Sequence, residues 1–193
     1  MSRKVTEKYE NPIDNYLYDV AEALHPYFYK LNFTPNGITT LSLITGIASI
    51  YYMYNKKFIQ FAILYFISYF FDCADGSYAR KYKMVSKFGD LYDHFKDWSV
   101  SLIGLWVLFS KYKLGKNLKL IIPIAIMIPL LIVHIGCQEK MYGKNESETL
   151  EISKRFCPAN TKNELEYITQ YTRFAGCGTF VLFQILIVYL LMK

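Results

Sequence analysis

The sequence predicts an all-α fold: a polytopic membrane helix bundle with five transmembrane helices, six being the alternative, and an amphipathic interfacial helix at the N-terminus. First, the chain of 193 residues is 53% hydrophobic and only 20% charged, which excludes a disordered or collagen-like chain. Second, three segments are uncharged over nearly the length needed to cross hydrocarbon. Third, two shorter apolar segments each adjoin acidic residues at helical spacing. These features argue against a water-soluble domain with a single core.

Residues 1–33 predict a cytosolic or interfacial segment that contains the amphipathic helix. Asn11 can cap this helix, Pro12 suits its first turn, and Pro26 is expected to interrupt it. Its apolar residues recur at spacings of four, three and four: Ile13, Leu17, Val20 and Leu24. Such a helix either lies flat at the membrane interface or packs against the cytosolic face of the bundle.

Residues 34–193 form the predicted membrane domain. The uncharged runs cover residues 38–54, 120–137 and 174–192, and about 17 to 25 helical residues cross a bilayer. The shorter runs, 58–71 and 98–110, become full-length helices if their remaining turns carry the neighbouring carboxylates. Two short core helices of a soluble protein are the less favoured alternative. The last helix is expected to begin at a Thr161 and Glu164 capping box and to bend at Gly176 or Gly178.

Lysine and arginine residues predict the orientation in the membrane. With five spans, the side that holds the acidic residues carries 15 of them and the opposite side carries 7. The positive-inside rule therefore predicts that the acidic residues face the cytosol. The net charge of +6 suits contact with anionic membrane lipids, whereas no basic stripe with interleaved aromatic residues indicates nucleic-acid binding. The four cysteines form no C-x-x-C pair and are expected to be reduced thiols.

Acidic and small residues recur at helical spacing between residues 72 and 97. Three- and four-residue steps align one set on a helix face: Asp72, Asp75, Gly76 and Ala79. Four-residue steps align a second set on the next helix: Gly89, Asp93 and Asp97. A tight reversal at residues 83–86, with Ser86 starting the second helix, would make the two helices antiparallel. The four carboxylates are therefore expected to converge.

Four neighbouring carboxylates require a compensating cation, because like charges repel strongly at low dielectric. Hard oxygen ligands without histidine or cysteine favour Mg²⁺, Mn²⁺ or Ca²⁺, and two divalent ions would balance four carboxylates. Gly76 and Gly89 permit close approach of a helix or a flat ligand, Ala79 keeps the face open, and Arg80 can bind a phosphate. Together these residues predict a site for a nucleotide diphosphate.

The complete pattern resembles the signature of the class-I CDP-alcohol phosphatidyltransferases. That signature is D-x-x-D-G-x-x-A-R, eight residues, then G-x-x-x-D-x-x-x-D, and the chain matches all eight fixed positions. The segment from Thr34 to Thr39, TPNGIT, also looks like the P-N-x-I-T sequence common in that family. The family usually has six membrane helices, whereas this sequence predicts five.

The resemblance implies transfer of a phospho-alcohol unit from a CDP-linked donor to the hydroxyl of a second alcohol, with release of CMP. By position, Asp72, Asp75 and Asp93 would bind Mg²⁺ or Mn²⁺, and Asp97 would lie near the ions as the general base. Three small residues would make room for the cytidine nucleotide: Gly76, Ala79 and Gly89. Arg80 would hold the diphosphate. Relatives are commonly dimers, so a homodimer is expected.

The motif around Asp93 is similar to that of choline and ethanolamine phosphotransferases. Gly89-Asp-Leu-Tyr-Asp93-His94 is close to the G-E-L-F-D-H form of those enzymes, which favours a CDP-choline or CDP-ethanolamine donor and a diacylglycerol acceptor. Asp90 and His94 are therefore candidate residues that line the site. A synthase that uses CDP-diacylglycerol with an inositol or glycerophosphate acceptor is the alternative, and a non-enzymatic cation-binding membrane protein is an alternative of another class.

Basic residues near the C-terminal helix are candidates for binding an acceptor phosphate or a lipid head group. They are Lys154, Arg155 and Arg173. A solvated basic face is the simpler interpretation of the same residues.

Overall fold

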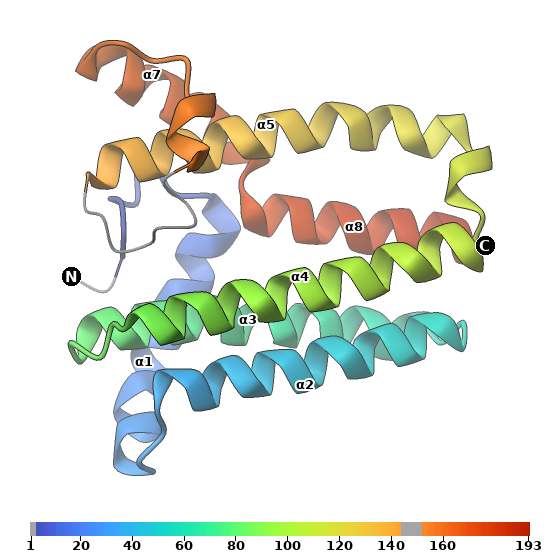
Figure 1. The fold of residues 1–193 in the computed structure, drawn as a ribbon, viewed down its shortest axis with the longest axis horizontal. Helices are drawn as coiled ribbons and strands as arrows, with labels where there is room; N and C mark the ends of the chain where they lie inside the picture. The colour runs from blue at the N-terminus through green and yellow to red at the C-terminus, as the bar shows by residue number, and fades with distance from the viewer. Residues whose placement is uncertain (1–2, 144–151) are drawn as a thin grey trace.

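The computed structural model describes residues 3–143 and 152–193, and every regular element in these residues is helical (Figure 1). The N-terminal helix α1 (Pro12–Lys30) crosses one end of the bundle, and most of the helices that follow it run side by side. The α-helices are α1 (Pro12–Lys30), α2 (Pro35–Tyr54), α3 (Phe58–Lys81), α4 (Lys87–Ser110), α5 (Leu118–Tyr142), α7 (Lys162–Thr172) and α8 (Cys177–Met192). The short 3₁₀ helices are η1 (Leu114–Lys116), η2 (Ile152–Phe156) and η3 (Arg173–Ala175).

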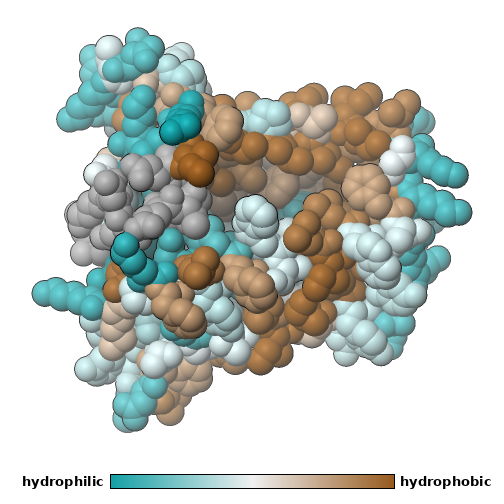
Figure 2. Space-filling view, in the orientation of Figure 1, coloured by the Kyte–Doolittle hydropathy of each residue, from teal (hydrophilic) through white to brown (hydrophobic). Residues whose placement is uncertain are grey.

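The surface of the bundle has an apolar band between two polar ends, as Figure 2 shows for one face. Among the described residues, three stretches are long and apolar enough to cross a membrane: Phe58–Lys81, Leu118–Tyr142 and Lys162–Met192. Helices α2 and α4 run alongside them. The prediction of an all-helical membrane bundle is confirmed.

Small and polar side chains hold α2 close to both α3 and α4. The Ser42 hydroxyl donates to the Ser68 carbonyl at 2.8 Å, and the Ser68 hydroxyl donates to the Ser42 carbonyl at 2.8 Å. A Cβ at Gly46 would lie 2.9 Å from the Cγ2 of Val100, so glycine is needed where α4 crosses. Close backbone approach and interhelical hydrogen bonds are the usual stabilising contacts between helices in lipid. The helices that carry the aspartates are thereby fixed against a common partner.

Helix α1 begins as predicted but does not end where predicted. The side chain of Asn11 caps it by accepting a hydrogen bond from the Ile13 amide at 3.0 Å. The prediction that Pro26 interrupts the helix is wrong, because α1 continues to Lys30. Proline removes the donor to the Glu22 carbonyl, and the Lys81 ammonium, 3.4 Å away, donates to that carbonyl instead.

The buried face of α1 packs against the bundle, principally α3, and differs in part from the predicted apolar stripe. Leu17 is buried as expected, but Val20 and Leu24 are only partly buried. The remaining buried positions are Asp14, Ala21 and His25. The polar residues can face inward because the bundle supplies partners for them. For example, His25 Nε2 lies 3.2 Å from the Ser77 hydroxyl of α3.

Asp14 joins α1 to both α3 and α8. Its carboxylate accepts hydrogen bonds from the Tyr69 hydroxyl at 2.6 Å and from the Gly178 amide at 3.3 Å. A side chain at Gly178 would overlap this carboxylate, which explains the glycine at that point. Burial raises the pKa of Asp14 to about 7.

The predicted caps near the C-terminal helix are confirmed. Thr161 and Glu164 form the capping box at the start of α7. The chain then breaks at Gly176, between η3 and α8, one of the two positions predicted for a bend. A Cβ at Gly176 would lie 3.0 Å from the Cβ of Asn11, so this glycine also permits the approach of the α1 start.

The prediction that all four cysteines are reduced is wrong for two of them. Cys137 of α5 and Cys157 form a disulfide, with their Cα atoms 4.9 Å apart. A side chain at Gly136 would overlap the Ser153 carbonyl oxygen, so this glycine lets η2 approach α5 and bring the two cysteines together. Cys73 and Cys177 are free thiols, as predicted.

Candidate active site

The N-terminal ends of α2 and α4 meet the C-terminal end of α3 where α1 crosses the bundle (Figure 1). The reversal between α3 and α4 is tight, as predicted: the Met84 amide donates to the Ala79 carbonyl at 2.8 Å, and Lys83 takes the left-handed conformation with φ of 57°. The Ser86 side chain then caps α4 by accepting from the Gly89 amide at 3.0 Å. This short connection places the two acidic faces opposite each other.

Three of the four aspartates converge. Asp72, Asp93 and Asp97 each offer a carboxylate oxygen, and these oxygens all lie within 4.8 Å of one another. Asp75 is placed differently, since it is buried and accepts a hydrogen bond of 2.6 Å from the Thr39 hydroxyl of α2. The aspartates therefore form a cluster of three with a fourth carboxylate beside it.

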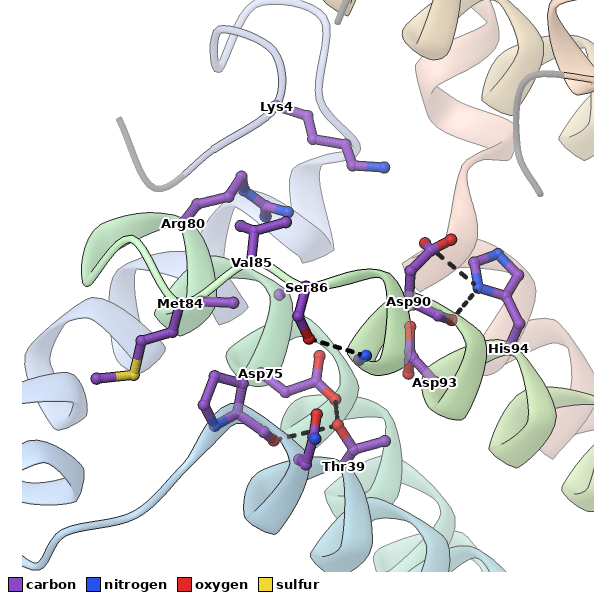
Figure 3. Close-up of a pocket in the computed structure, with 15 residues that line it drawn as sticks. Lys4, Thr39, Asp75, Arg80, Met84, Val85, Ser86, Asp90, Asp93 and His94 are labelled. Atoms are coloured by element: carbon purple, nitrogen blue, oxygen red, sulfur yellow. Dashed lines mark hydrogen bonds and ion pairs between the residues drawn. The ribbon is translucent and has the colours of Figure 1, made fainter. Parts of the chain in front are cut away.

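A cavity opens next to Asp75 and Asp93 (Figure 3). The other candidate residues that line it are Gly76, Ala79, Arg80, Gly89, Asp90 and His94. Lys4, Pro35, Asn36, Thr39, Met84, Val85 and Ser86 complete the lining. Asp72 and Asp97 are not among the described residues that line this cavity. The cavity thus collects every residue expected to contact the nucleotide, together with two of the expected metal ligands.

The two motif glycines each leave space for a neighbouring polar side chain. A Cβ at Gly76 would lie 3.3 Å from Arg80 Nη1, so the guanidinium group folds over this glycine. A Cβ at Gly89 would lie 3.1 Å from both Asn36 Oδ1 and the Ser86 hydroxyl. Larger residues would displace groups that line the cavity.

Asp90 and His94 lie together on the α4 side of the cavity. His94 Nδ1 is 2.7 Å from the Asp90 carbonyl oxygen and 3.6 Å from Asp90 Oδ1. Figure 3 shows this pair on the opposite side of the Ser86 turn from Arg80. The structure therefore brings both residues into the predicted site.

The three basic candidates near the C-terminal helix do not join the cavity. Lys154 and Arg155 lie in η2, and none of the three is among the described residues that line the cavity. Arg173 donates to the backbone carbonyl of Lys8 at 2.8 Å and lies against the ring of Phe174. This contact attaches the N-terminal segment to η3.

Several residues of the site were not identified from the sequence, and three of them bear on its charge and hydrogen bonding. Thr39 appeared in the sequence analysis only as part of the TPNGIT segment and not as a site residue. Lys4 lines the cavity although it precedes the predicted membrane domain, and its ammonium pairs with Glu139 at 2.6 Å. Lys96 is the largest omission, because its ammonium forms ion pairs with all three clustered aspartates. Its position three residues after Asp93 was the available signal.

The donor set suits a hard divalent cation. Carboxylate oxygens are the ligands that Mg²⁺ and Mn²⁺ favour. Asp93 Oδ1 is already paired with the Lys96 ammonium at 3.2 Å, but Asp75 and Asp93 both bring carboxylates to the cavity lining. The residues present therefore fit a metal ion on the cavity side of Asp93.

Comparison with known families identifies the chain. A model of the CDP-alcohol phosphatidyltransferase family matches residues 32–150, more than half of the chain and nearly all of the cavity lining. Comparisons with curated proteins and with solved structures gave no match. Members of this family are phosphotransferases that transfer substituted phosphate groups and generally use divalent metal ions. The chain therefore belongs to the CDP-alcohol phosphatidyltransferase family.

Proposed function

We propose that this chain transfers phosphocholine or phosphoethanolamine from the CDP-alcohol to diacylglycerol and releases CMP. The family supports transfer of a phospho-alcohol unit from a CDP-alcohol. The observation that carries the choice of donor is the position of Asp90, which lines the same cavity as Gly76 and Arg80. A carboxylate there, outside the cluster of three, favours a donor whose alcohol carries a positively charged amine.

In this proposal, different lining residues contact different parts of the donor. Arg80 binds the diphosphate through its planar, permanently charged guanidinium group. Gly76, Ala79 and Gly89 leave room for the cytidine nucleotide. Asp90, with His94 beside it, faces the cationic alcohol.

Mg²⁺ or Mn²⁺ would be held by carboxylates of the four motif aspartates: Asp72, Asp75, Asp93 and Asp97. When bound, the ion supplies positive charge that neutralises the phosphate oxygens of the donor. The sequence-based expectation of two ions did not take Lys96 into account.

Asp97 is the proposed general base. The oxygen of the acceptor hydroxyl attacks the β-phosphorus of the donor, the bond from that phosphorus to the oxygen bridging to CMP breaks, and Asp97 takes the hydroxyl proton. The Asp97 side chain is 51% exposed, so an acceptor can reach it, whereas the Lys96 side chain next to it is 3% exposed. We expect Asp97→Asn to lower the rate of CMP release at least 100-fold while donor binding is largely retained.

CMP release from a panel of CDP-alcohols tests the proposal. Purified protein in lipid with Mg²⁺ or Mn²⁺ should release CMP from CDP-choline or CDP-ethanolamine when diacylglycerol is supplied. Asp90→Asn should weaken the preference for these donors over CDP-diacylglycerol, and Asp90→Glu is the matched control that keeps the charge. CMP release only from CDP-diacylglycerol with inositol or glycerophosphate would support the alternative synthase. No CMP release from any donor, despite binding of divalent cations, would support the cation-binding alternative.

We also propose the arrangement of the chain in the membrane. Residues 34–193 form the catalytic membrane domain, the active-site end faces the cytosol, and two copies of the chain associate as a homodimer. The excess of lysine and arginine at the active-site end supports this orientation. Lys154 and Arg155, in η2, are proposed to contact lipid head groups.

A further inference from the structure

Lys96 already places a positive charge among the clustered aspartates. Its side chain is 3% exposed, and its ammonium lies 2.7 Å from Asp97 Oδ1 and 3.2 Å from Asp93 Oδ1. It also forms an ion pair with Asp72 Oδ1. These are the same three residues whose carboxylate oxygens lie close enough together to share one cation. The ammonium therefore occupies a cation position.

The family motif does not require this lysine. Lys96 stands between the last two aspartates of G-x-x-x-D-x-x-x-D, at a position that the motif leaves open. Three residues after Asp93 on a helix, its side chain lies on the face that carries the carboxylates. The arrangement is thus a property of this chain in addition to the shared motif.

The remaining carboxylate defines a second position on the cavity side. Asp75 accepts a hydrogen bond from Thr39 and lines the cavity, and it is not one of the aspartates that form ion pairs with Lys96. Asp93 belongs to both positions, because it lines the cavity and also lies near the ammonium. The four aspartates therefore offer one position that is filled by Lys96 and one that is open to the cavity.

We propose that Lys96 is a permanent internal cation that replaces one of two metal ions, so that the active site binds a single divalent cation on the side of Asp75 and Asp93. This inference rests on the proposed function of the site. One divalent ion and the ammonium nearly balance four carboxylates, and the donor diphosphate brings further negative charge. With the ammonium in place, two divalent ions would bring the total to five positive charges against four carboxylates, and one of the ions would compete with the ammonium for the same oxygens. A divalent ion bound to the same oxygens would lie close to the ammonium, and two cations that close repel by several kcal/mol at low dielectric.

Binding of Mn²⁺ to the full chain in phosphatidylcholine nanodiscs tests this directly. Electron paramagnetic resonance of free Mn²⁺ during a titration, without donor, should give one tightly bound ion per wild-type chain. Lys96→Met keeps the length of the apolar side chain and removes the charge, so it should bind two ions and show spin coupling between them. Lys87→Met removes an exposed lysine from the same helix and should still bind one ion.

The wild-type stoichiometry is decisive even if Lys96→Met does not fold. Two tightly bound ions per wild-type chain would overturn the inference, as would one ion in a folded Lys96→Met variant. The proposed function fails separately. If the wild type releases CMP from CDP-alcohols and binds two ions, only the internal-cation inference is wrong. If the wild type binds one ion, Lys96→Met binds two and no CDP-alcohol is cleaved, only the proposed function is wrong.

Discussion

Replacing Thr39 by valine would remove the hydroxyl that contacts Asp75 and that also lies 3.1 Å from the Pro35 carbonyl of its own helix. The Thr39 hydroxyl donates to Asp75 Oδ2 at 2.6 Å, and both residues are buried. Valine has nearly the same shape but no hydroxyl. A hydrogen bond to a charged group contributes about 1.5–3 kcal/mol, and each 1.4 kcal/mol changes an equilibrium constant about tenfold. If Asp75 binds the metal, Thr39→Val should weaken Mn²⁺ binding about 10- to 100-fold, as is typical when a partner of a metal ligand is lost.

Two variants distinguish this effect from a general disturbance of α2. Thr39→Ser keeps the hydroxyl and should bind Mn²⁺ with nearly wild-type affinity. Thr40→Val removes the neighbouring hydroxyl, which lies 2.8 Å from the Asn36 carbonyl and 3.0 Å from the Tyr92 hydroxyl and does not contact an aspartate. It should leave Mn²⁺ affinity nearly unchanged. The measurement is the same titration followed by paramagnetic resonance. Wild-type affinity in Thr39→Val, or equal losses in Thr39→Ser and Thr39→Val, would refute the assignment of Asp75 as a ligand supported by Thr39.

Two further predictions concern other parts of the chain. The pKa of Asp14 is about 7 in the folded protein, well above its ordinary value, so the stability from its protonated form is present at acid pH and lost as the pH rises through 7. Between pH 6 and 8, the free energy of unfolding should fall by about 1 kcal/mol more in the wild type than in Asp14→Asn, and equal pH slopes in chemical unfolding would contradict this. The Cys137–Cys157 disulfide predicts that, in cells lysed into denaturant with a maleimide, these two cysteines are labelled only after reduction, unlike Cys73 and Cys177. Labelling of all four cysteines without reduction would contradict the disulfide and would accord with the proposed cytosolic orientation, because disulfides are rare in the cytosol.

Local signals predicted much of the helical framework. Ser86 and Thr161 cap the helices that they were expected to cap, because a cap depends on a few residues adjacent in sequence. The convergence of Asp72, Asp93 and Asp97 followed from helical spacing combined with one tight reversal. These features require no knowledge of how distant segments pack.

Contacts between distant segments were the part that the sequence could not predict. Pro26 stays within α1 because Lys81, far along the chain, donates to the carbonyl that proline leaves without a partner. The disulfide depends on the close approach of η2 to α5 at Gly136, and spacing of the cysteines gives no indication of it. Periodicity alone likewise could not indicate that Asp14 would find buried partners on α3 and α8.

Lys96 entered the sequence-based predictions only through the count of basic residues for membrane orientation and was not identified as part of the site. The orientation argument counted it among 15 basic residues on one side of the membrane, and removing it leaves 14 against 7, so the predicted orientation is unchanged. Its burial among aspartates depends on α3 and α4 together, since Asp72 belongs to one helix and Asp93 and Asp97 to the other. A count by segment does not contain that information.

The position of Lys96 also bears on how such a site can exist without bound metal. Carboxylates within 4.8 Å of one another repel, and this repulsion favours separation of the two acidic helices. The Lys96 ammonium of α4 pairs with Asp72 of α3 and opposes that separation. Asp75 receives different support, a neutral hydroxyl from α2, which leaves its charge available to a cation in the cavity. The Lys96 ammonium of α4 thus suits a permanent positive charge beside Asp72. The Thr39 hydroxyl of α2 positions Asp75 without neutralising it, which suits an exchangeable cation in the cavity.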